Sequence, residues 1–318
     1  MIKILANDGI SQSGVDALKA KGFEVITQKV AQEQLSNVIN EQNIEVLLVR
    51  SATKVRKELI DSCPGLKMIG RGGVGMDNID VEYAKNIGIE VINTPAASSS
   101  SVAELVFAHL FSMVRFVHQS NREMPLSGDH KFKDLKKAFA KGQELRGKTL
   151  GIIGFGRIGQ EVAQRAIGLG MRVVAHDKFI KETTIPLSFF DGQSLDFKIT
   201  TSSLKDLLSS SDFVSLHIPK VGDKAVIGSS EFSQMKEGAG IINAARGGVI
   251  DENALIEALK SGHISAAGLD VFENEPQPSI ELLMQDNISL TPHIGAATLE
   301  AQDRIGTELA EKIGQYFN

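Results

Sequence analysis

Residues 151–159 read GIIGFGRIG, in which Gly154, Gly156 and Gly159 form the pattern G-x-G-x-x-G. The pattern directly follows an apolar run that begins at Thr149, and it directly precedes a segment with helical periodicity. In such a β-α-β unit the first glycine permits a tight turn, the second lets the backbone approach a pyrophosphate, and the third lets the helix pack closely on the strand. The sequence therefore predicts a dinucleotide-binding turn made by Gly154, Gly156, Arg157, Ile158 and Gly159.

A carboxylate follows at the position where the ribose-binding acid of such a unit is expected. The second apolar run, Met171–His176, ends in Asp177, eighteen positions after Gly159. A carboxylate here accepts hydrogen bonds from the ribose hydroxyls and repels a 2′-phosphate. We therefore predict NAD rather than NADP as the cofactor. The alternative, a β-α-β unit that binds no nucleotide, stays open at this point.

Short apolar runs alternate with helix-period segments along the whole chain. The strands expected in the first series are Lys3–Ala6, Glu24–Thr27, Glu45–Val49, Leu66–Gly70 and Glu90–Ile92. The strands expected in the second series are Thr149–Ile153, Arg172–His176, Phe213–His217, Gly240–Ala244, Ala266–Asp270 and Ile288–Leu290. These runs lack polar alternation, which is typical of parallel strands covered by helices on both faces.

Two such series predict an α/β protein with two doubly wound parallel-sheet domains and an interdomain cleft. We expect a flavodoxin-like substrate domain and a Rossmann nucleotide domain. The last amphipathic segment, Leu299–Phe317, is expected to return to the first domain because connections are short. The predicted boundaries are 1–98 plus 293–318 for the substrate domain and 99–292 for the NAD-binding domain.

The composition restricts the classes of function. The chain has 318 residues, 42% of them hydrophobic and 23% charged, and its formal net charge is −5. Such a chain has the core of a globular protein and no basic excess to neutralise a nucleic acid. No apolar run is long enough for a signal peptide or a membrane span, so we expect a cytoplasmic location. We predict no metal site, no nucleic-acid partner and no membrane partner.

Reactive and charged side chains follow the later strands of the second series. Arg246, Asp270 and His293 each stand at the end of such a strand, and Glu275 lies shortly after Asp270. In an open α/β sheet, ligands bind beyond the carboxyl ends of the strands. Taken singly, Arg246 could equally be a surface cation, Glu275 a solvated turn residue and His293 a structural histidine. Together, behind a dinucleotide-binding turn, they indicate a catalytic site.

Nicotinamide chemistry requires a group that exchanges the alcohol proton and a cation that orients an acid substrate. His293 is a candidate for the proton exchange because imidazoles in general titrate near neutral pH, and a carboxylate such as Glu275 would stabilise the protonated form and fix the tautomer. The guanidinium of Arg246 can hold a carboxylate through two parallel hydrogen bonds.

Several motifs together resemble the D-isomer-specific 2-hydroxyacid dehydrogenase family over nearly the whole chain. They are GFGRIG at 154–159, NAARGGVID at 243–251, LDVFENEP at 269–276 and PHIGAAT at 292–298. Within the family, VRSATKV at 49–55 and GRGGVGMDNID at 70–80 are most similar to members that oxidise 3-phosphoglycerate. The resemblance implies Arg246, Glu275 and His293 as the catalytic set.

The resemblance also implies contacts to the ligands. The substrate contacts would be Arg50, Ser51, Gly73, Val74, Arg246 and His293. The cofactor contacts beyond the glycine turn and Asp177 would be Val74, His217, Ile218, Pro219, Ala244, Ala245, Asp270 and Gly295. From the residues alone, Arg50 could equally make an ordinary surface or interdomain ion pair.

The activity implied is NAD-dependent oxidation of a D-2-hydroxy acid, with 3-phosphoglycerate as the expected substrate and 3-phosphohydroxypyruvate as the product, in serine biosynthesis. Reduction of hydroxypyruvate, glyoxylate or another 2-ketoacid is the alternative. An NAD-sensing regulatory protein is an alternative of another class. The resemblance favours a homodimer or homotetramer. From the residues alone, the apolar helix after Ser101 and an irregular arm at 122–147 could form a two-fold interface, or the helix could belong to the core. We expect no appended regulatory domain.

Overall fold

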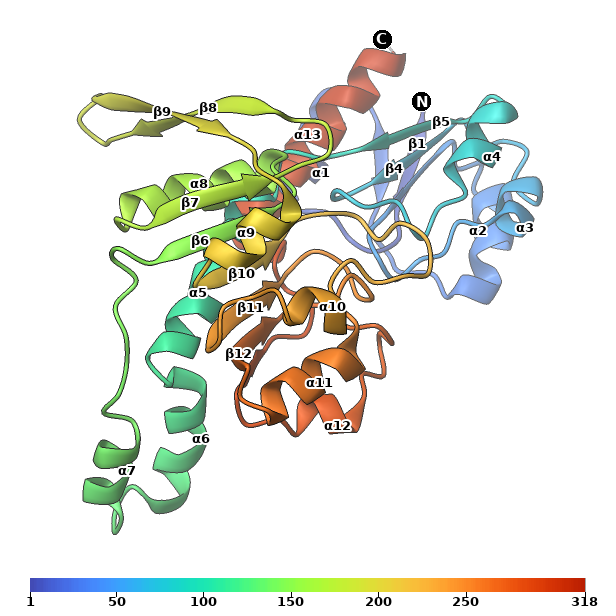
Figure 1. Ribbon diagram of the computed structural model, residues 1–318. Coiled ribbons are helices and arrows are strands. Elements are labelled where there is room, and N and C mark those ends of the chain that lie inside the picture. The colour runs from blue at the N-terminus through green and yellow to red at the C-terminus, as the bar shows by residue number, and fades with distance from the viewer. Residues whose placement is uncertain (318) are drawn as a thin grey trace. The chain divides into compact units, whose positions relative to one another are not determined.

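The computed structural model describes residues 1–317 of the chain and divides the chain into two units (Figure 1). Unit 1 comprises Met1–Ser101 and Ala296–Asn318, and unit 2 comprises Val102–Gly295. The predicted domain boundaries lie at residues 98 and 293, so His293 falls in unit 2 instead of the predicted substrate domain. Its neighbours Ile294 and Gly295 are hydrogen-bonded to Asp270 of unit 2, which is the physical reason for the difference.

Unit 1 is built on a five-stranded parallel sheet with the strand order β2-β1-β3-β4-β5. The strands are β1 (Lys3–Ala6), β2 (Glu24–Ile26), β3 (Val46–Val49), β4 (Met68–Arg71) and β5 (Glu90–Asn93). The order reverses between β1 and β3, as in the flavodoxin-like fold that the sequence predicts.

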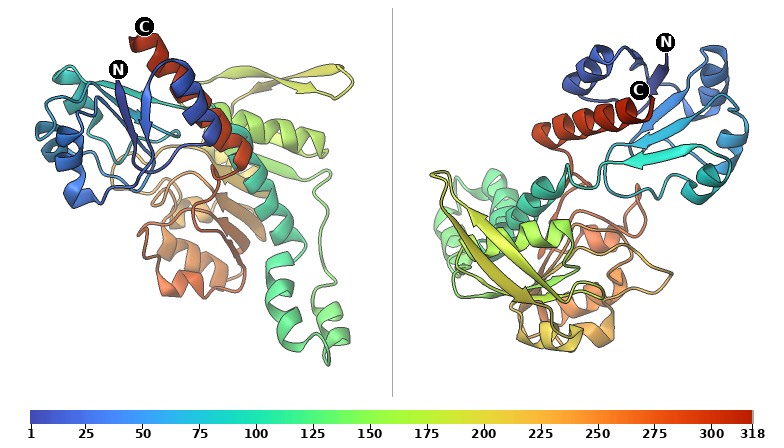
Figure 2. Two further views of the ribbon diagram at one scale, coloured as in Figure 1. Left: turned by 180° about the vertical axis from the view of Figure 1, so that it is seen from behind. Right: turned by 90° about the horizontal axis from the view of Figure 1, so that it is seen from above.

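Helices cover both faces of the unit 1 sheet. One face carries α1 (Gln12–Ala20) and α13 (Leu299–Phe317), which lie side by side (Figure 2). The other face carries α2 (Leu35–Glu41), α3 (Lys57–Asp61) and α4 (Val81–Asn86), and a short 3₁₀ turn, η1 (Gln32–Gln34), precedes α2. Alternate strand residues enter the two cores, so Ile4 packs with α13 and Leu5 packs with α2.

Unit 2 contains a six-stranded parallel sheet with the order β13-β12-β11-β10-β6-β7. The strands are β6 (Thr149–Ile153), β7 (Arg172–His176), β10 (Phe213–Leu216), β11 (Ala239–Asn243), β12 (Ile264–Leu269) and β13 (Ile288–Leu290). The order reverses at β6 and β10, and the register pairs Ile153 with His176 and Leu216 with Ile153. The predicted α/β class with doubly wound parallel sheets is confirmed.

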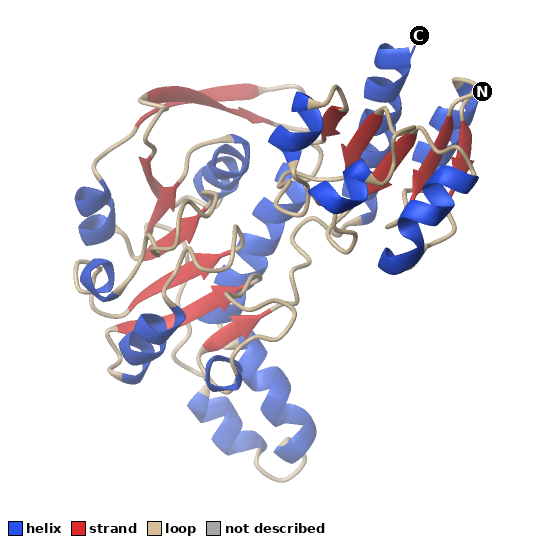
Figure 3. Cartoon of the chain, turned by 90° about the vertical axis from the view of Figure 1, so that its right-hand side faces the viewer, coloured by secondary structure: helices blue, strands red, loops and turns tan. Residues whose placement is uncertain are grey.

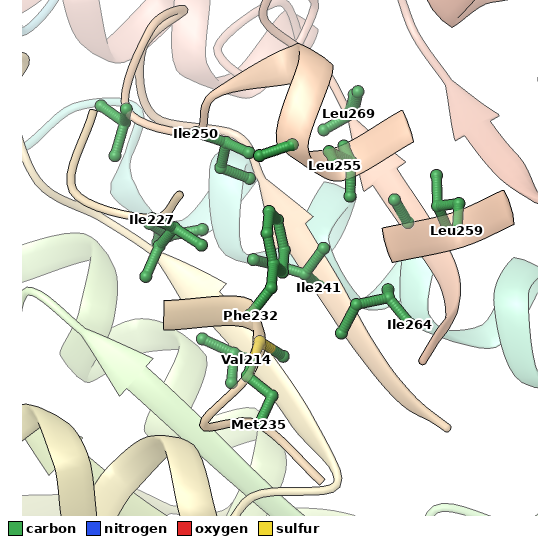
Figure 4. Packing of buried hydrophobic residues seen from close by; sticks show 14 of the residues in the cluster. Val214, Ile227, Phe232, Met235, Ile241, Ile250, Leu255, Leu259, Ile264 and Leu269 are labelled. Atoms are coloured by element: carbon green, nitrogen blue, oxygen red, sulfur yellow. The ribbon is translucent and has the colours of Figure 1, made fainter. Parts of the chain in front are cut away.

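The helices of unit 2 also lie on both faces of its sheet (Figure 3). One face packs against α5 (Ser99–Val114) and α8 (Arg157–Gly168). The opposite core receives α9 (Leu204–Ser210), α10 (Ser229–Phe232), α11 (Glu252–Lys260) and α12 (Ile280–Leu283), and Figure 4 shows Phe232 and Leu255 packed beside strand residue Ile241. Burial of these apolar side chains is the main stabilising contribution to the unit.

Beyond α5 the chain forms two more helices, α6 (Val117–Ser127) and α7 (Phe132–Ala138). The second half of α6 and all of α7 lie within residues 122–147, which were predicted to be irregular. Among residues 1–317 no single helix has the length and apolar composition of a membrane span. The bent pair α5 and α6, which meets at 59°, satisfies both criteria only when the two helices are taken together.

One element of unit 2 was missed by the sequence analysis. An antiparallel hairpin, β8 (Glu182–Ser188) and β9 (Ser194–Thr200), follows β7 (Figure 1). Apolar residues alternate with polar ones along it, and Ile185 is buried while Phe190 at the tip is fully exposed. The apolar runs used to find strands do not detect this alternation, although a period of two is typical of a half-buried strand.

A buried histidine joins α5 to the edge strand of the unit 2 sheet. His109 is 2% exposed, and its Nδ1 and Nε2 atoms lie 2.9 Å from Ser289 Oγ and 3.0 Å from Thr291 Oγ1. Burial lowers the pKa of His109 to about 4, against the opposing attraction of Asp270. The imidazole is therefore neutral at neutral pH.

This pKa makes the stability of the protein depend on pH. Between about pH 6.5 and 4 the unfolded chain binds a proton at His109 that the folded chain does not, so stability falls as the pH drops through this window. The loss from this group is about 3 kcal/mol between pH 7 and pH 4. Urea unfolding of the wild type and of His109→Gln at both pH values measures it. Equal losses in the two proteins would contradict the assignment, since every other group titrates in both.

Candidate active site

The glycine turn between β6 and α8 has the shape needed to hold a pyrophosphate. Gly154 has φ +92°, and a Cβ there would lie 2.4 Å from the carbonyl oxygen of His217. A Cβ on Gly159 would lie 2.2 Å from the Gly154 carbonyl oxygen, so the helix can approach the strand only with glycine. Gly156 is the N-cap of α8, and a Cβ on it would meet no atom within 4 Å. The space beside Gly156 at the N-terminus of α8 is thus open, which fits the close approach of an anionic group.

Asp177 lies immediately after β7 and is fixed by backbone donors. Its Oδ2 atom accepts a hydrogen bond from Phe155 N at 2.7 Å, and its Oδ1 atom accepts from Phe179 N at 2.8 Å and Ile180 N at 3.0 Å. Burial alone would raise the pKa of this carboxyl, but the three donors outweigh it, so the pKa of Asp177 lies below its usual range. An ionised carboxylate beside the glycine turn fits the ribose of NAD and repels a 2′-phosphate.

The ends of β10 and β11 bring further predicted residues to the same sheet edge. His217, Ile218 and Pro219 follow β10, and His217 N donates to the Ile153 carbonyl at 2.7 Å. Burial lowers the pKa of His217 to about 3, and its Nε2 atom lies 2.8 Å from Ser215 Oγ. Ala244 and Ala245 follow β11. The neutral ring of His217 and the small side chains of Ala244 and Ala245 therefore add no charge to this edge of the sheet.

Arg246 is positioned by the end of β11. The Asn243 side chain accepts a hydrogen bond from Ala245 N at 3.0 Å and donates one to the Arg246 carbonyl at 2.9 Å. Arg246 Nη1 donates to the Ala245 carbonyl at 2.7 Å. The next residue, Gly247, approaches so closely that a Cβ would lie 1.7 Å from the Phe272 carbonyl oxygen. The Arg246 turn is therefore packed directly against the segment that leads to Glu275.

Glu275 and His293 form a hydrogen-bonded pair. His293 Nδ1 lies 2.7 Å from Glu275 Oε2, and the other carboxylate oxygen accepts a hydrogen bond from Phe272 N at 3.0 Å. Because a carboxylate only accepts, Nδ1 carries the proton, and the lone pair of Nε2 is left to accept another. The His293 side chain is 46% exposed. This arrangement can take a proton from a ligand hydroxyl and stabilise the resulting imidazolium.

Asp270 is hydrogen-bonded to the backbone that directly follows His293. It is 1% exposed at the end of β12, and its Oδ1 and Oδ2 atoms accept hydrogen bonds from Ile294 N and Gly295 N, each at 2.8 Å. The turn that contains His293 is strained, because His293 has φ +55°. Left-handed backbone costs roughly 1–3 kcal/mol at a non-glycine residue. The resemblance implies a nicotinamide-side contact for Asp270, and in this structure its oxygens also hold the His293 turn.

The remaining predicted residues belong to unit 1. Arg50 and Ser51 follow β3, and Arg50 N donates to Asp8 Oδ2 at 2.7 Å. Gly73 has φ +141°, and the Val74 carbonyl accepts a hydrogen bond from Asn93 Nδ2 at 2.8 Å. The predicted contacts of these residues with substrate and cofactor stay predictions.

Two residues that support the site, Thr291 and His109, were not predicted from the sequence. Thr291 donates to Asp270 Oδ1 at 2.6 Å, and His109 lies next to Thr291. Thr291 could have been noticed because it precedes the Pro292-His293 motif, whereas no local signal marks His109, which lies 182 positions away. Among residues 1–317 no group of three or more His, Cys, Asp or Glu side chains is arranged to hold a metal ion.

Comparison with known proteins gives the same family as the motifs. Residues 107–295 match the family described as D-isomer specific 2-hydroxyacid dehydrogenase, NAD binding domain. The chain is 43% identical over 317 residues to a hydroxypyruvate reductase of Thermotoga maritima, covering 98% of this chain and 97% of that protein. It is 41% identical over 314 residues to a D-3-phosphoglycerate dehydrogenase of Methanocaldococcus jannaschii, covering 98% of this chain but only 57% of that protein.

Solved structures agree with these relatives. A D-lactate dehydrogenase from Aquifex aeolicus, complexed with NAD and lactic acid, is 30% identical and superposes with a TM-score of 0.74, covering 99% of this chain and 95% of that one. The glycine turn and Asp177 fit NAD, and NAD is the cofactor of this chain. The chain belongs to the D-isomer specific 2-hydroxyacid dehydrogenase family, and it is an NAD-dependent D-2-hydroxyacid dehydrogenase.

Proposed function

We propose that the chain oxidises 3-phosphoglycerate to 3-phosphohydroxypyruvate, a step of serine biosynthesis. The relative from Methanocaldococcus jannaschii carries the name of this activity. The observation that carries the proposal for this chain is the place of Arg50 in unit 1. A phosphorylated acid needs a cation beyond the one that holds its carboxylate. Arg50 supplies that cation, and unit 1 is the substrate-binding part of the chain.

Arg50 stands where a sheet of this order binds ligands. It follows β3, and the strand order of unit 1 reverses between β1 and β3. Asp8, which follows β1, accepts hydrogen bonds from Arg50 N at 2.7 Å and from Thr53 Oγ1 at 2.7 Å. Asn78 Nδ2 donates to the Arg50 carbonyl at 2.9 Å. The backbone of Arg50 is thus clamped from two sides, and Ser51 presents a hydroxyl beside it.

The proposed chemistry uses three side chains of unit 2. Arg246 holds the substrate carboxylate through its guanidinium fork and polarises the adjacent carbon–oxygen bond. His293 Nε2 accepts the proton of the C2 hydroxyl, and Glu275 stabilises the imidazolium through the Nδ1 hydrogen bond of 2.7 Å. NAD, when bound at the glycine turn, supplies the hydride acceptor. In the reverse direction His293 returns the proton to the carbonyl oxygen.

A second candidate is reduction of hydroxypyruvate. It is favoured by the relative from Thermotoga maritima, which carries the name of this activity and is 43% identical to this chain. The chain spans about half the length of the phosphoglycerate dehydrogenase relatives. Both reactions use the same carboxylate clamp and the same proton transfer. They differ in the phosphate, and hence in the need for Arg50.

A comparison of acids distinguishes the two candidates. The rate of NADH formation or consumption is measured with 3-phosphoglycerate, glycerate and hydroxypyruvate, for the wild type and for Arg50→Ala. We expect kcat/KM for 3-phosphoglycerate to fall by about 10–100-fold in the variant, since a charge-assisted hydrogen bond is lost, and the values for the unphosphorylated acids to change little. An equal loss for all acids, or a wild type that prefers hydroxypyruvate, would contradict the phosphate-binding role.

We also propose that two copies of the chain associate through α5, α6 and α7. Large apolar side chains on these helices are exposed: Phe111 at 43%, Val117 at 47%, Met124 at 44%, Leu126 at 74% and Phe132 at 57%. Between α5 and α8 lies a pocket of about 430 Å³ that Phe107, Phe111 and Leu169 help to line. Exposed large apolar side chains gathered on consecutive helices are typical of an interface between protein chains. A homotetramer stays the alternative, and the cytoplasmic location stays a prediction.

A further inference from the structure

We propose that His109 is a positioning residue for His293, acting through Thr291 and Asp270. This inference rests on the proposed role of His293 as the proton acceptor. His109 belongs to α5, which contributes no catalytic group, and no motif includes it. Its connection to the active site is a continuous chain of hydrogen bonds within unit 2.

The direction of each hydrogen bond between Ser289 and Asp270 follows from the last acceptor, the carboxylate of Asp270. The Thr291 hydroxyl donates to Asp270 Oδ1 at 2.6 Å, so its oxygen must accept from His109 Nε2, which lies 3.0 Å away. The imidazole therefore carries its proton on Nε2, and Nδ1 accepts from the Ser289 hydroxyl at 2.9 Å. The low pKa of His109, about 4, keeps the ring in this neutral form. Every donor in the sequence Ser289, His109, Thr291, Asp270 has an acceptor.

The final acceptor, Asp270, holds the strained part of the site. Its two oxygens bind the backbone N–H groups of Ile294 and Gly295, directly after His293 with φ +55°. Thr291 N is also bonded to the Leu269 carbonyl at 3.0 Å, so the turn is tied to β12 before and after His293. Rotation of the Asp270 carboxylate would release the turn and turn Nδ1 of His293 away from Glu275.

The packing of α5 shows why the histidine can reach this position. A Cβ on Gly268 would lie 2.7 Å from His109 Cβ, so α5 crosses β12 at a glycine, two residues before Asp270. A Cβ on Gly295 would lie 3.0 Å from Asp270 Oδ2 and 3.5 Å from a methyl carbon of Val102, which also belongs to α5. The helix α5 is thus packed close to β12 and to the turn that Asp270 holds. This packing leaves the hydrogen-bonded residues little room to shift.

Two amide substitutions of His109 test the roles of its two ring nitrogen atoms separately. His109→Gln can place an amide N–H near the position of Nε2 and donate to Thr291, whereas the shorter His109→Asn reaches only toward Ser289. We expect kcat to fall about 10-fold in His109→Asn and to be largely restored in His109→Gln, because one hydrogen bond of the chain is broken or kept. NADH affinity, measured by NADH fluorescence, should change much less than kcat in both, because the glycine turn and Asp177 are untouched.

Two further variants keep the test independent of folding. Ser289→Ala is the matched control, since it removes a hydrogen bond to the same ring but leaves the path to Asp270 intact, and its kcat should equal that of the wild type. Thr291→Val removes the hydroxyl between His109 and Asp270 with little change of shape, and its kcat should fall as far as that of His109→Asn. The double variant, with both His109→Asn and Thr291→Val, should lose no more kcat than either single variant.

Equal kcat in His109→Asn, Ser289→Ala and the wild type would overturn the proposal, as would equal losses in His109→Asn and His109→Gln with no loss in Thr291→Val. Each rate is a ratio to the wild type with whichever acid the wild type turns over, so an incorrect substrate assignment leaves this test unaffected. Normal turnover in His293→Ala would instead refute the proposed proton acceptor itself.

Discussion

His293→Ala retains NADH affinity but loses about 10²–10⁴-fold in kcat, the usual contribution of a positioned general base. The physical reason is that Nε2 is the atom left to accept the hydroxyl proton, since Nδ1 is held by Glu275 at 2.7 Å. The glycine turn and Asp177 are separate from this pair and keep the cofactor site intact. Steady-state rates and NADH fluorescence titration of the same preparation measure the two quantities.

The partner of the histidine provides a graded control. Glu275→Gln keeps an oxygen that can accept from His293 Nδ1 but removes the negative charge that stabilises the imidazolium. Its loss in kcat should therefore be smaller than that of His293→Ala and should exceed zero. Near-normal turnover in His293→Ala would remove the proton-transfer role, and a larger loss in Glu275→Gln than in His293→Ala would contradict the assigned order of roles.

Arg246→Lys lowers kcat/KM by about 10–100-fold, because an ammonium group cannot make the two parallel hydrogen bonds of a guanidinium fork. The substitution retains the positive charge, so the loss reports geometry rather than attraction alone. Rates at low acid concentration measure kcat/KM. The fold should survive, since the turn is fixed by Asn243 through the backbone of Ala245 and Arg246.

A second arginine of unit 2 serves as the comparison. Arg165 on α8 is paired with Glu161 at 2.7 Å, and Arg165→Lys should leave kcat/KM unchanged. An unchanged kcat/KM in Arg246→Lys would contradict the bidentate clamp. Equal losses in both variants would mean that the effect comes from a general disturbance of unit 2 and not from the lost guanidinium fork of Arg246.

The parallel sheets could be predicted because their signal is local. Runs such as Val46–Val49 and Ala239–Asn243 are buried over their whole length, and a strand covered on both faces needs an unbroken apolar run. The hairpin of β8 and β9 was missed for the opposite reason. It buries Ile185 on one face only and leaves Phe197 on β9 38% exposed, so its residues alternate instead of forming a run.

The site could be predicted where a reactive side chain directly follows a strand of the parallel sheet. Arg246, Asp270 and His293 each follow a strand of one sheet, and parallel strands end at one edge, so their neighbourhood follows from topology. The supporting residues could not be found in this way. His109 meets Ser289 and Thr291 across 180 and 182 positions of sequence, and the contact depends on α5 crossing β12 at Gly268. Such a contact is set by helix packing, which no local pattern encodes.

The role of Asp270 illustrates the same limit. The family resemblance implies a contact with the nicotinamide, and the sequence alone offers no other use for a carboxylate at that position. In the folded chain its oxygens accept from Thr291, Ile294 and Gly295, which ties it to the backbone around His293. A buried carboxylate with several donors is rigid, and rigidity is what a strained catalytic turn requires.

We propose that this chain transfers a hydride from a D-2-hydroxy acid to NAD while His293 takes the proton. The most direct measurement is NADH absorbance during incubation of the purified protein and NAD with 3-phosphoglycerate and other D-2-hydroxy acids, and with their L-enantiomers. We expect NADH formation with the D-acids, with 3-phosphoglycerate the best of them, and none with His293→Ala. Absence of NADH with every D-acid from a protein that binds NAD, or equal rates in the wild type and His293→Ala, would contradict this proposal.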